Sequence, residues 1–86
     1  MQNHLKINPN FIIEEIEDVI SIIDPINSYI LSFNNTGTFI FKLLQKNYST
    51  KYISRELHSK FELSEETARK DIQQFIVQLQ KAHVFL

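Results

Sequence analysis

The stretch SYILSFNNTGTFIFKLL, residues 28–44, contains the transition that decides the fold of this chain. Apolar and polar positions alternate before residue 34, which predicts a strand with two distinct faces, one bearing Tyr29, Leu31 and Phe33 and the other Ile30 and Ser32. Two asparagines, a threonine and the only glycine of the chain follow. Asparagine side chains readily accept the free N–H groups of a first helical turn. The stretch therefore predicts a strand that ends at a helix cap, Asn34 or Asn35.

Two further strands are predicted upstream of this transition. The segments FIIEE (11–15) and EDVISIID (17–24) are rich in isoleucine and valine, which favour half-buried, pleated backbone. DPIN (24–27) then places Asp, Pro and Asn at turn positions. The second of these strands is thus expected to form a hairpin with residues 28–33.

Three amphipathic helices are predicted after the transition, because the apolar period changes to about 3.6 residues. The second is capped by Ser49 or Thr50 and the third by Ser64. Their apolar faces are Ile40, Leu43 and Leu44 with Phe39 and Phe41; Ile53, Leu57 and Phe61; and Ala68, Ile72, Phe75, Ile76 and Leu79. Gly37, in the first turn of the first helix, allows another element to approach closely. We expect one α+β domain over residues 1–86, a three-stranded antiparallel sheet followed by three helices, as in winged helix-turn-helix domains.

The composition indicates a folded cytoplasmic domain. Of 86 residues, 43% are hydrophobic, and nine basic residues stand against ten acidic ones. The absence of cysteine excludes disulfides and thiolate metal sites. The opening MQNHLKINPN lacks the apolar core of a signal peptide, and no stretch reaches the roughly 18 apolar residues of a membrane span. We therefore expect no contact with a membrane.

No pattern of residues points to catalysis. His4, His58 and His83 are far apart in sequence, and none has the spacing of a metal-binding motif. A single glycine excludes a glycine-rich phosphate loop, and the run EEIED is typical of a charged edge or turn. We expect no catalytic residue, no metal and no cofactor.

Several short motifs occur in one order across residues 11–86. A strand end followed by Asn-x-Thr-Gly occupies Phe33, Asn34, Thr36 and Gly37; Thr-x-x-Ile-x-x-x-Leu occupies Thr50, Ile53 and Leu57; and Ala-x-x-Asp occupies Ala68 and Asp71, before the tail AHVFL. In this order and spacing the chain resembles the PqqD-like family, whose members recognise the leader peptides of ribosomally synthesised and post-translationally modified peptides. It departs from that family at KNYS (46–49), where an acidic residue followed by glycine is usual, and at His83, where glycine is common.

The resemblance implies both a function and a site. Such domains hold the leader as an added strand on the last strand of the sheet, beside the third helix, and present the precursor to a maturation enzyme. An open sheet edge suits this role because its N–H and C=O groups are unpaired. The leader-binding residues implied are Tyr29, Ile30, Leu31, Ser32 and Phe33 on the strand, and Asp71, Gln74, Phe75, Gln78 and Leu79 on the third helix. The partners implied are a precursor leader peptide and a maturation enzyme, either a radical enzyme that uses S-adenosylmethionine or the leader peptidase of a lasso-peptide pathway.

Two other functions stay open. A winged-helix DNA-binding protein would use the basic side chains of the second and third helices, Lys51, Arg55, Lys60, Arg69 and Lys70, together with Gln73. Against it, residues 1–37 carry one lysine and five acidic residues, where a wing would meet phosphates, so we expect no nucleic acid partner. A homodimer would instead pair the edge strands of two copies, with Val77, Phe85 and Leu86 as further apolar surface.

Overall fold

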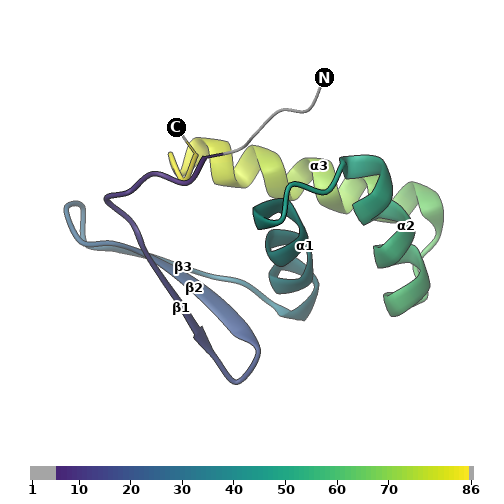
Figure 1. Cartoon of the computed structure of the whole chain (residues 1–86), viewed down its shortest axis with the longest axis horizontal. Coiled ribbons are helices and arrows are strands. Elements are labelled where there is room, and N and C mark those ends of the chain that lie inside the picture. The colour runs from purple at the N-terminus through teal and green to yellow at the C-terminus, as the bar shows by residue number, and fades with distance from the viewer. Residues whose placement is uncertain (1–5, 86) are drawn as a thin grey trace.

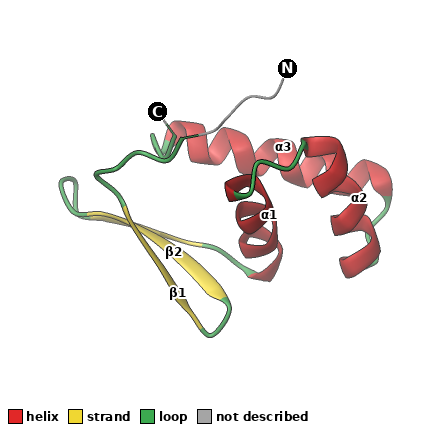
Figure 2. Ribbon diagram, viewed as in Figure 1, coloured by secondary structure: helices red, strands yellow, loops and turns green. Residues whose placement is uncertain are grey.

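Three antiparallel strands precede three helices in the computed structural model, which describes residues 6–85. The elements are β1 (Ile12–Ile16), β2 (Val19–Asp24), β3 (Tyr29–Ser32), α1 (Asn35–Gln45), α2 (Thr50–Phe61) and α3 (Glu65–Lys81). Figures 1 and 2 show the sheet on one side of the molecule and the helices on the other. The α+β class and the predicted element order are confirmed. His4 and Leu86 lie outside the described residues.

The sheet has the order β1-β2-β3, so β3 is an edge strand. Ile20 and Ile22 of β2 are buried against the helices, and Leu31 pairs with Ile22 on that inner face. The outer face carries Ile23, which pairs with Ile12 of β1 and Ile30 of β3. The predicted alternation of β3 therefore holds, with Leu31 turned toward the core and Ile30 turned outward.

Glu17 and Asp18 form the tight turn between β1 and β2. Both have positive φ, 50° and 64°, and they connect the paired residues Ile16 and Val19. Two-residue hairpin loops with two positive φ values are type I′ turns, in which Asn-Gly is strongly preferred. The second strand thus begins at Val19 and not at residue 17, because this turn takes two residues of the predicted strand.

This turn gives a prediction about stability. Replacing Glu17 by Asn and Asp18 by Gly should raise the free energy of unfolding by about 1–2 kcal/mol, since left-handed backbone is costly for other residues. Urea denaturation of the double variant and the parent measures the difference. A single substitution of Glu14 by Gln, in the adjacent strand, is the control for removal of acidic charge.

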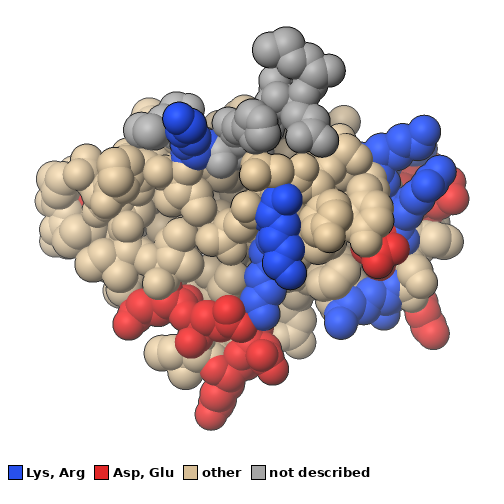
Figure 3. Space-filling view, in the orientation of Figure 1, with Lys and Arg blue, Asp and Glu red and all other residues tan. Residues whose placement is uncertain are grey.

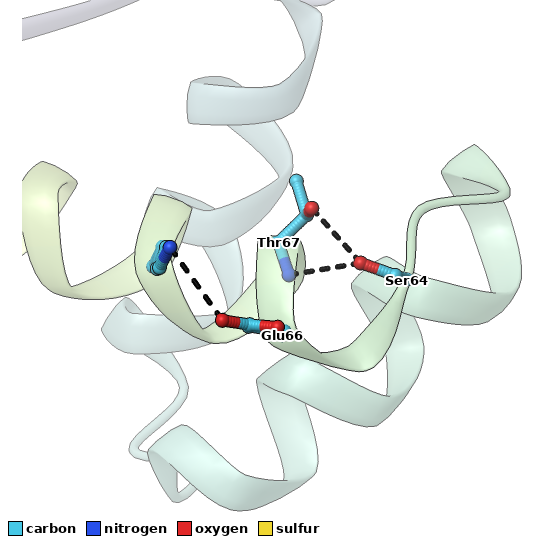
Figure 4. Close-up of polar contacts among 4 residues, drawn as sticks. Ser64, Glu66 and Thr67 are labelled. Carbon is cyan, nitrogen blue, oxygen red and sulfur yellow. Dashed lines mark hydrogen bonds and ion pairs between the residues drawn. The ribbon is translucent and has the colours of Figure 1, made fainter.

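Each helix begins at a side-chain cap. The acceptors are Asn34, Ser49 and Ser64. At α3 the Ser64 Oγ accepts from the Thr67 N–H at 3.1 Å and donates to the Thr67 Oγ1 at 2.9 Å (Figure 4). These contacts satisfy N–H groups that no helical carbonyl can reach. They fix where the helices begin, and for α1 that point lies directly after β3.

The core joins the sheet to the helices. Its buried apolar residues are Ile20, Ile22, Phe33, Ile40, Phe41, Leu44, Ile53, Leu57, Ala68, Ile72, Phe75, Leu79 and Val84. The predicted helix faces are confirmed, although Phe39, Leu43, Phe61 and Ile76 lie at the rim and are only partly buried. Buried Thr38 adds a polar link, because its Oγ1 accepts the N–H of Ile20 at 3.1 Å. This bond fixes the first turn of α1 against β2.

The two ends of the described chain lie side by side, as the trace in Figure 1 also shows. The Asn8 N–H donates to the Val84 carbonyl at 2.7 Å, and Ile7 forms a β-bridge with Phe85. Phe85 is therefore partly buried against the core, and the expectation that it supplies an open apolar surface is wrong. Val77, by contrast, is 46% exposed, as the sequence led us to expect. Among residues 6–85, no helix has both the length and the hydropathy needed to span a membrane.

Candidate binding groove

A groove of about 380 Å³ lies where β3 ends, α1 begins and α3 passes. Its lining comes from all three elements: Ser32, Phe33, Asn34, Thr36, Gly37, Ile40, Asp71, Gln74, Phe75 and Gln78. The cap at Asn34 ends the strand and turns α1 away from it, which leaves room beside the strand end. The groove is thus a product of the strand-to-helix transition itself.

The groove has an aromatic floor. The rings of Phe33 and Phe75 meet edge to face with centroids 4.8 Å apart, and Phe41 packs behind Phe33 at 5.4 Å. Phe33 and Phe75 are 6% and 8% exposed, so only small parts of these rings reach the surface. A Cβ on Gly37 would lie 3.0 Å from Phe75 Cε1 and 3.2 Å from Phe33 Cβ. The close approach predicted for Gly37 is confirmed, and it is what allows α1 to pack on this pair of rings.

One wall of the groove is polar and comes from α3. Gln74 and Gln78 are exposed, and Asp71 is half-buried. Lys70 forms an ion pair with Glu66 at 3.6 Å, so this neighbouring cation is not directed to Asp71. Amide groups both donate and accept hydrogen bonds, which suits them to a peptide backbone or to polar side chains. The wall therefore offers hydrogen bonds beside an apolar floor.

The free edge of β3 borders the groove. The Phe33 N–H donates to the Ile20 carbonyl at 3.0 Å, so Phe33 directs its backbone groups toward β2. Successive residues of a strand direct these groups to opposite sides, and the N–H and C=O groups of Ile30 and Ser32 therefore point to the open edge. The Oγ atoms of Ser32 and Ser21 are 3.0 Å apart, as expected for a pair without ladder bonds. Two residues of β3 are thus available to pair with an added strand.

The structure brings most of the predicted site residues together. Six of the ten line the groove: Ser32, Phe33, Asp71, Gln74, Phe75 and Gln78. Tyr29 and Ile30 are exposed farther along the edge strand, and Leu31 is half-buried on its inner face. Leu79 is fully buried in the core, so it supports the fold and offers no surface to a ligand.

Four lining residues were not among the predicted site residues. They are Asn34, Thr36, Gly37 and Ile40, all at or near the start of α1. The sequence explains each of them as a cap, a first-turn residue or a core residue. Their position in the sequence could have identified them. A residue that caps a helix directly after an edge strand must lie beside whatever binds that edge.

Ionisable groups with shifted pKa values stabilise other parts of the fold. The side-chain amide of Asn27 donates to Asp24 at 2.8 Å and lowers the pKa of Asp24 below its ordinary 3.8. This contribution to stability is present above pH 3.8 and is lost as the pH falls through the lowered value. A hydrogen bond with Glu15, at 2.6 Å, raises the pKa of Lys42 and joins β1 to α1. Asp24 thus stabilises the turn after β2, and Lys42 stabilises the contact between β1 and α1; neither residue lines the groove.

Comparison with known proteins places this geometry in a family. The family described as coenzyme PQQ synthesis protein D (PqqD) matches residues 20–84. A solved structure of a lasso peptide synthetase B1 complexed with the leader peptide is similar, with a TM-score of 0.89, 18% identity, and coverage of 98% of this chain and 99% of that one. A structure of TbiB1 in complex with the TbiA(beta) leader peptide has a TM-score of 0.82, 16% identity and 93% coverage of both chains.

No curated protein matches this chain. At 16% and 18% identity, the two solved structures establish the fold. The family match covers well over half of the sequence, so the resemblance drawn from the motifs is confirmed. The chain belongs to the PqqD family.

Proposed function

We propose that this chain binds the leader of a ribosomally synthesised precursor peptide and presents the precursor to a maturation enzyme. The observation that carries the proposal is the open edge of β3, which adjoins a groove with an aromatic floor and an amide wall. Two solved structures of the same fold are complexes with leader peptides, which supports leader binding as the function.

The leader binds as a fourth strand beside β3. Its backbone pairs with the N–H and C=O groups of Ile30 and Ser32, as in other strand-addition complexes. Every second leader side chain then points toward the groove, where one or two apolar side chains meet the exposed parts of Phe33 and Phe75. Gln74 and Gln78 hydrogen-bond around them. Backbone pairing supplies affinity, and the shape of the floor selects the side chains.

The role of the bound leader is to raise the effective concentration of the precursor at the enzyme. A leader held on β3 tethers the rest of the precursor nearby, while that remainder stays free to react. The chain acts as an adaptor, and the chemistry belongs to its partner. Of the two enzyme classes considered, the fold similarity to a lasso peptide synthetase B1 favours a leader peptidase over a radical enzyme.

The charge distribution argues against the DNA-binding alternative. Glu14, Glu15, Glu17 and Asp18 lie on β1 and its turn, the part of the fold that would form a wing. Figure 3 shows acidic side chains gathered over this hairpin, whereas lysine and arginine side chains lie mostly toward α2, interspersed with acidic ones. Phosphates passing over both regions would meet repulsion at the hairpin.

Amide chemical shifts test this function. We expect a cognate leader peptide to shift amides of residues 29–33 and 71–79 in the isotope-labelled protein. Residues 51–60 of α2 should not respond to the leader. Shifts in α2 on addition of duplex DNA, with no response to the leader, would reverse the assignment.

A further inference from the structure

A second groove, of about 530 Å³, lies between the first turns of α2 and α3. It is on the other side of α3 from the groove beside β3, where we propose that the leader binds and which we call the leader groove. Arg69, which lines the second groove, and Gln78, which lines the first, are nine residues apart, which places them about 180° apart around the helix. The two grooves share no lining residue. A ligand can therefore occupy one while the other is filled.

Three cations converge on this second groove. Lys51 and Arg55 lie one turn apart on α2, and Arg69 reaches the groove from α3. One carboxylate, Glu65, lies among them. Within residues 6–85 the ion pairs are Lys42 with Glu15 and Lys70 with Glu66, so none of the three groove cations is neutralised by an ion pair there. The groove carries excess positive charge that an anionic ligand would offset.

The floor of the same groove is not charged. Ile72 is 2% exposed and Ser54 is 9% exposed, and both line the groove beneath the basic side chains. The aliphatic stems of lysine and arginine also present apolar surface below their charged ends. The apolar part of this lining, Ile72 and the side-chain stems, fits a ligand that places an aliphatic side chain between carboxylates. Arginine pairs with carboxylates through two parallel hydrogen bonds, which adds geometric selectivity.

We propose that this cationic groove binds an acidic polypeptide segment of a partner protein, one that carries an aliphatic side chain between glutamate or aspartate residues. Three cations above a partly apolar floor match such a segment in charge and in polarity. The position opposite the leader groove allows the chain to hold leader and partner at once. This binding does not depend on the leader, so the two proposals are tested separately.

The test uses the acetylated peptide Glu-Glu-Glu-Leu-Glu-Glu-Glu and the full-length isotope-labelled chain. We expect shifts at Lys51, Arg55, Arg69 and Gln73, and an affinity that falls as salt is added. Arg69→Glu should weaken peptide binding at least roughly tenfold. Arg55→Glu, on α2, should weaken peptide binding to a similar extent. It replaces Arg69→Glu in the test if that variant does not fold.

Lys70→Glu is the matched control, since it makes the same change in charge one residue away from Arg69 but outside the groove. It should retain peptide affinity within about twofold, because an exposed charge outside the groove contributes little. Four results would overturn the proposal: no shifts with the peptide, shifts confined to other residues, an equal loss of affinity in Lys70→Glu, or tighter binding of duplex DNA through the same side chains.

Discussion

Gln78→Arg should weaken leader binding by at least about 1.4 kcal/mol, or roughly tenfold. Gln78 is exposed on the wall of the groove beside β3, so arginine places a long charged side chain where we propose that the leader binds. Either the arginine loses its water against the bound peptide, or it displaces the peptide, and both reduce the binding free energy. The free energy of unfolding should change by well under about 1 kcal/mol, because the side chain is on the surface. Calorimetric titration of the leader measures the effect.

Controls for this result lie on other sides of α3. Arg69→Ala and Lys70→Ala should leave leader affinity nearly unchanged, since neither residue lines the leader groove. If the chain bound DNA, Arg69→Ala and Lys70→Ala would instead weaken its contacts with phosphates. If Gln78→Arg binds the leader like the parent while Arg69→Ala does not, the leader binds on the opposite side of the helix.

Gly37→Val should reduce both stability and leader affinity. A Cβ at this position lies 3.0 Å from Phe75 Cε1 and 3.2 Å from Phe33 Cβ, and valine adds two further methyl groups. The Phe75 ring must move, which deforms the floor of the groove. Overpacking of this kind costs about 1–3 kcal/mol of stability. We expect leader affinity to fall by at least roughly tenfold, again measured by calorimetry.

Thr38→Val shows whether Gly37→Val weakens leader binding through lost stability or through the changed shape of the groove floor. It removes the buried acceptor of the Ile20 N–H and should cost a comparable 1–3 kcal/mol or so of stability. Thr38 does not line the leader groove, so leader affinity should stay within about twofold of the parent at temperatures where the variant is folded. Equal losses of affinity in the two variants would mean that destabilisation, and not the shape of the floor, weakens binding.

The fold was largely predictable because its signals are local. Ser64 begins α3 as predicted, and each of the other two caps is one of the two neighbouring residues considered. Alternation in residues 29–33 gave the faces of β3 correctly. The turn at Glu17 and Asp18 could not be predicted, because glutamate rarely adopts positive φ, no glycine follows Asp18, and the sequence continues as a strand pattern. The contact of Ile7 and Asn8 with the C-terminal tail was also missed, since it joins segments at opposite ends of the chain.

The leader groove was only partly predictable, because it depends on how β3, α1 and α3 pack. The family resemblance implied Asp71, Gln74 and Gln78 as site residues, but it also implied Leu79, which is fully buried. Gly37 was interpreted only as a point of close packing, although it also lines the groove. The cationic groove needed the tertiary structure as well. From the sequence, its basic residues were considered only as a surface for DNA, on two separate helices whose packing was unknown.

Hydrogen exchange at the edge of β3 tests strand addition most directly. In the free protein the amides of Ile30 and Ser32 face the open edge and should exchange rapidly. Those of Leu31 and Phe33 face β2, where Phe33 bonds to Ile20, and should be protected throughout. Saturating leader should slow exchange at Ile30 and Ser32 by at least about tenfold, because the bound strand accepts both N–H groups. Leader binding that leaves these two amides exchanging as in the free protein would contradict the account.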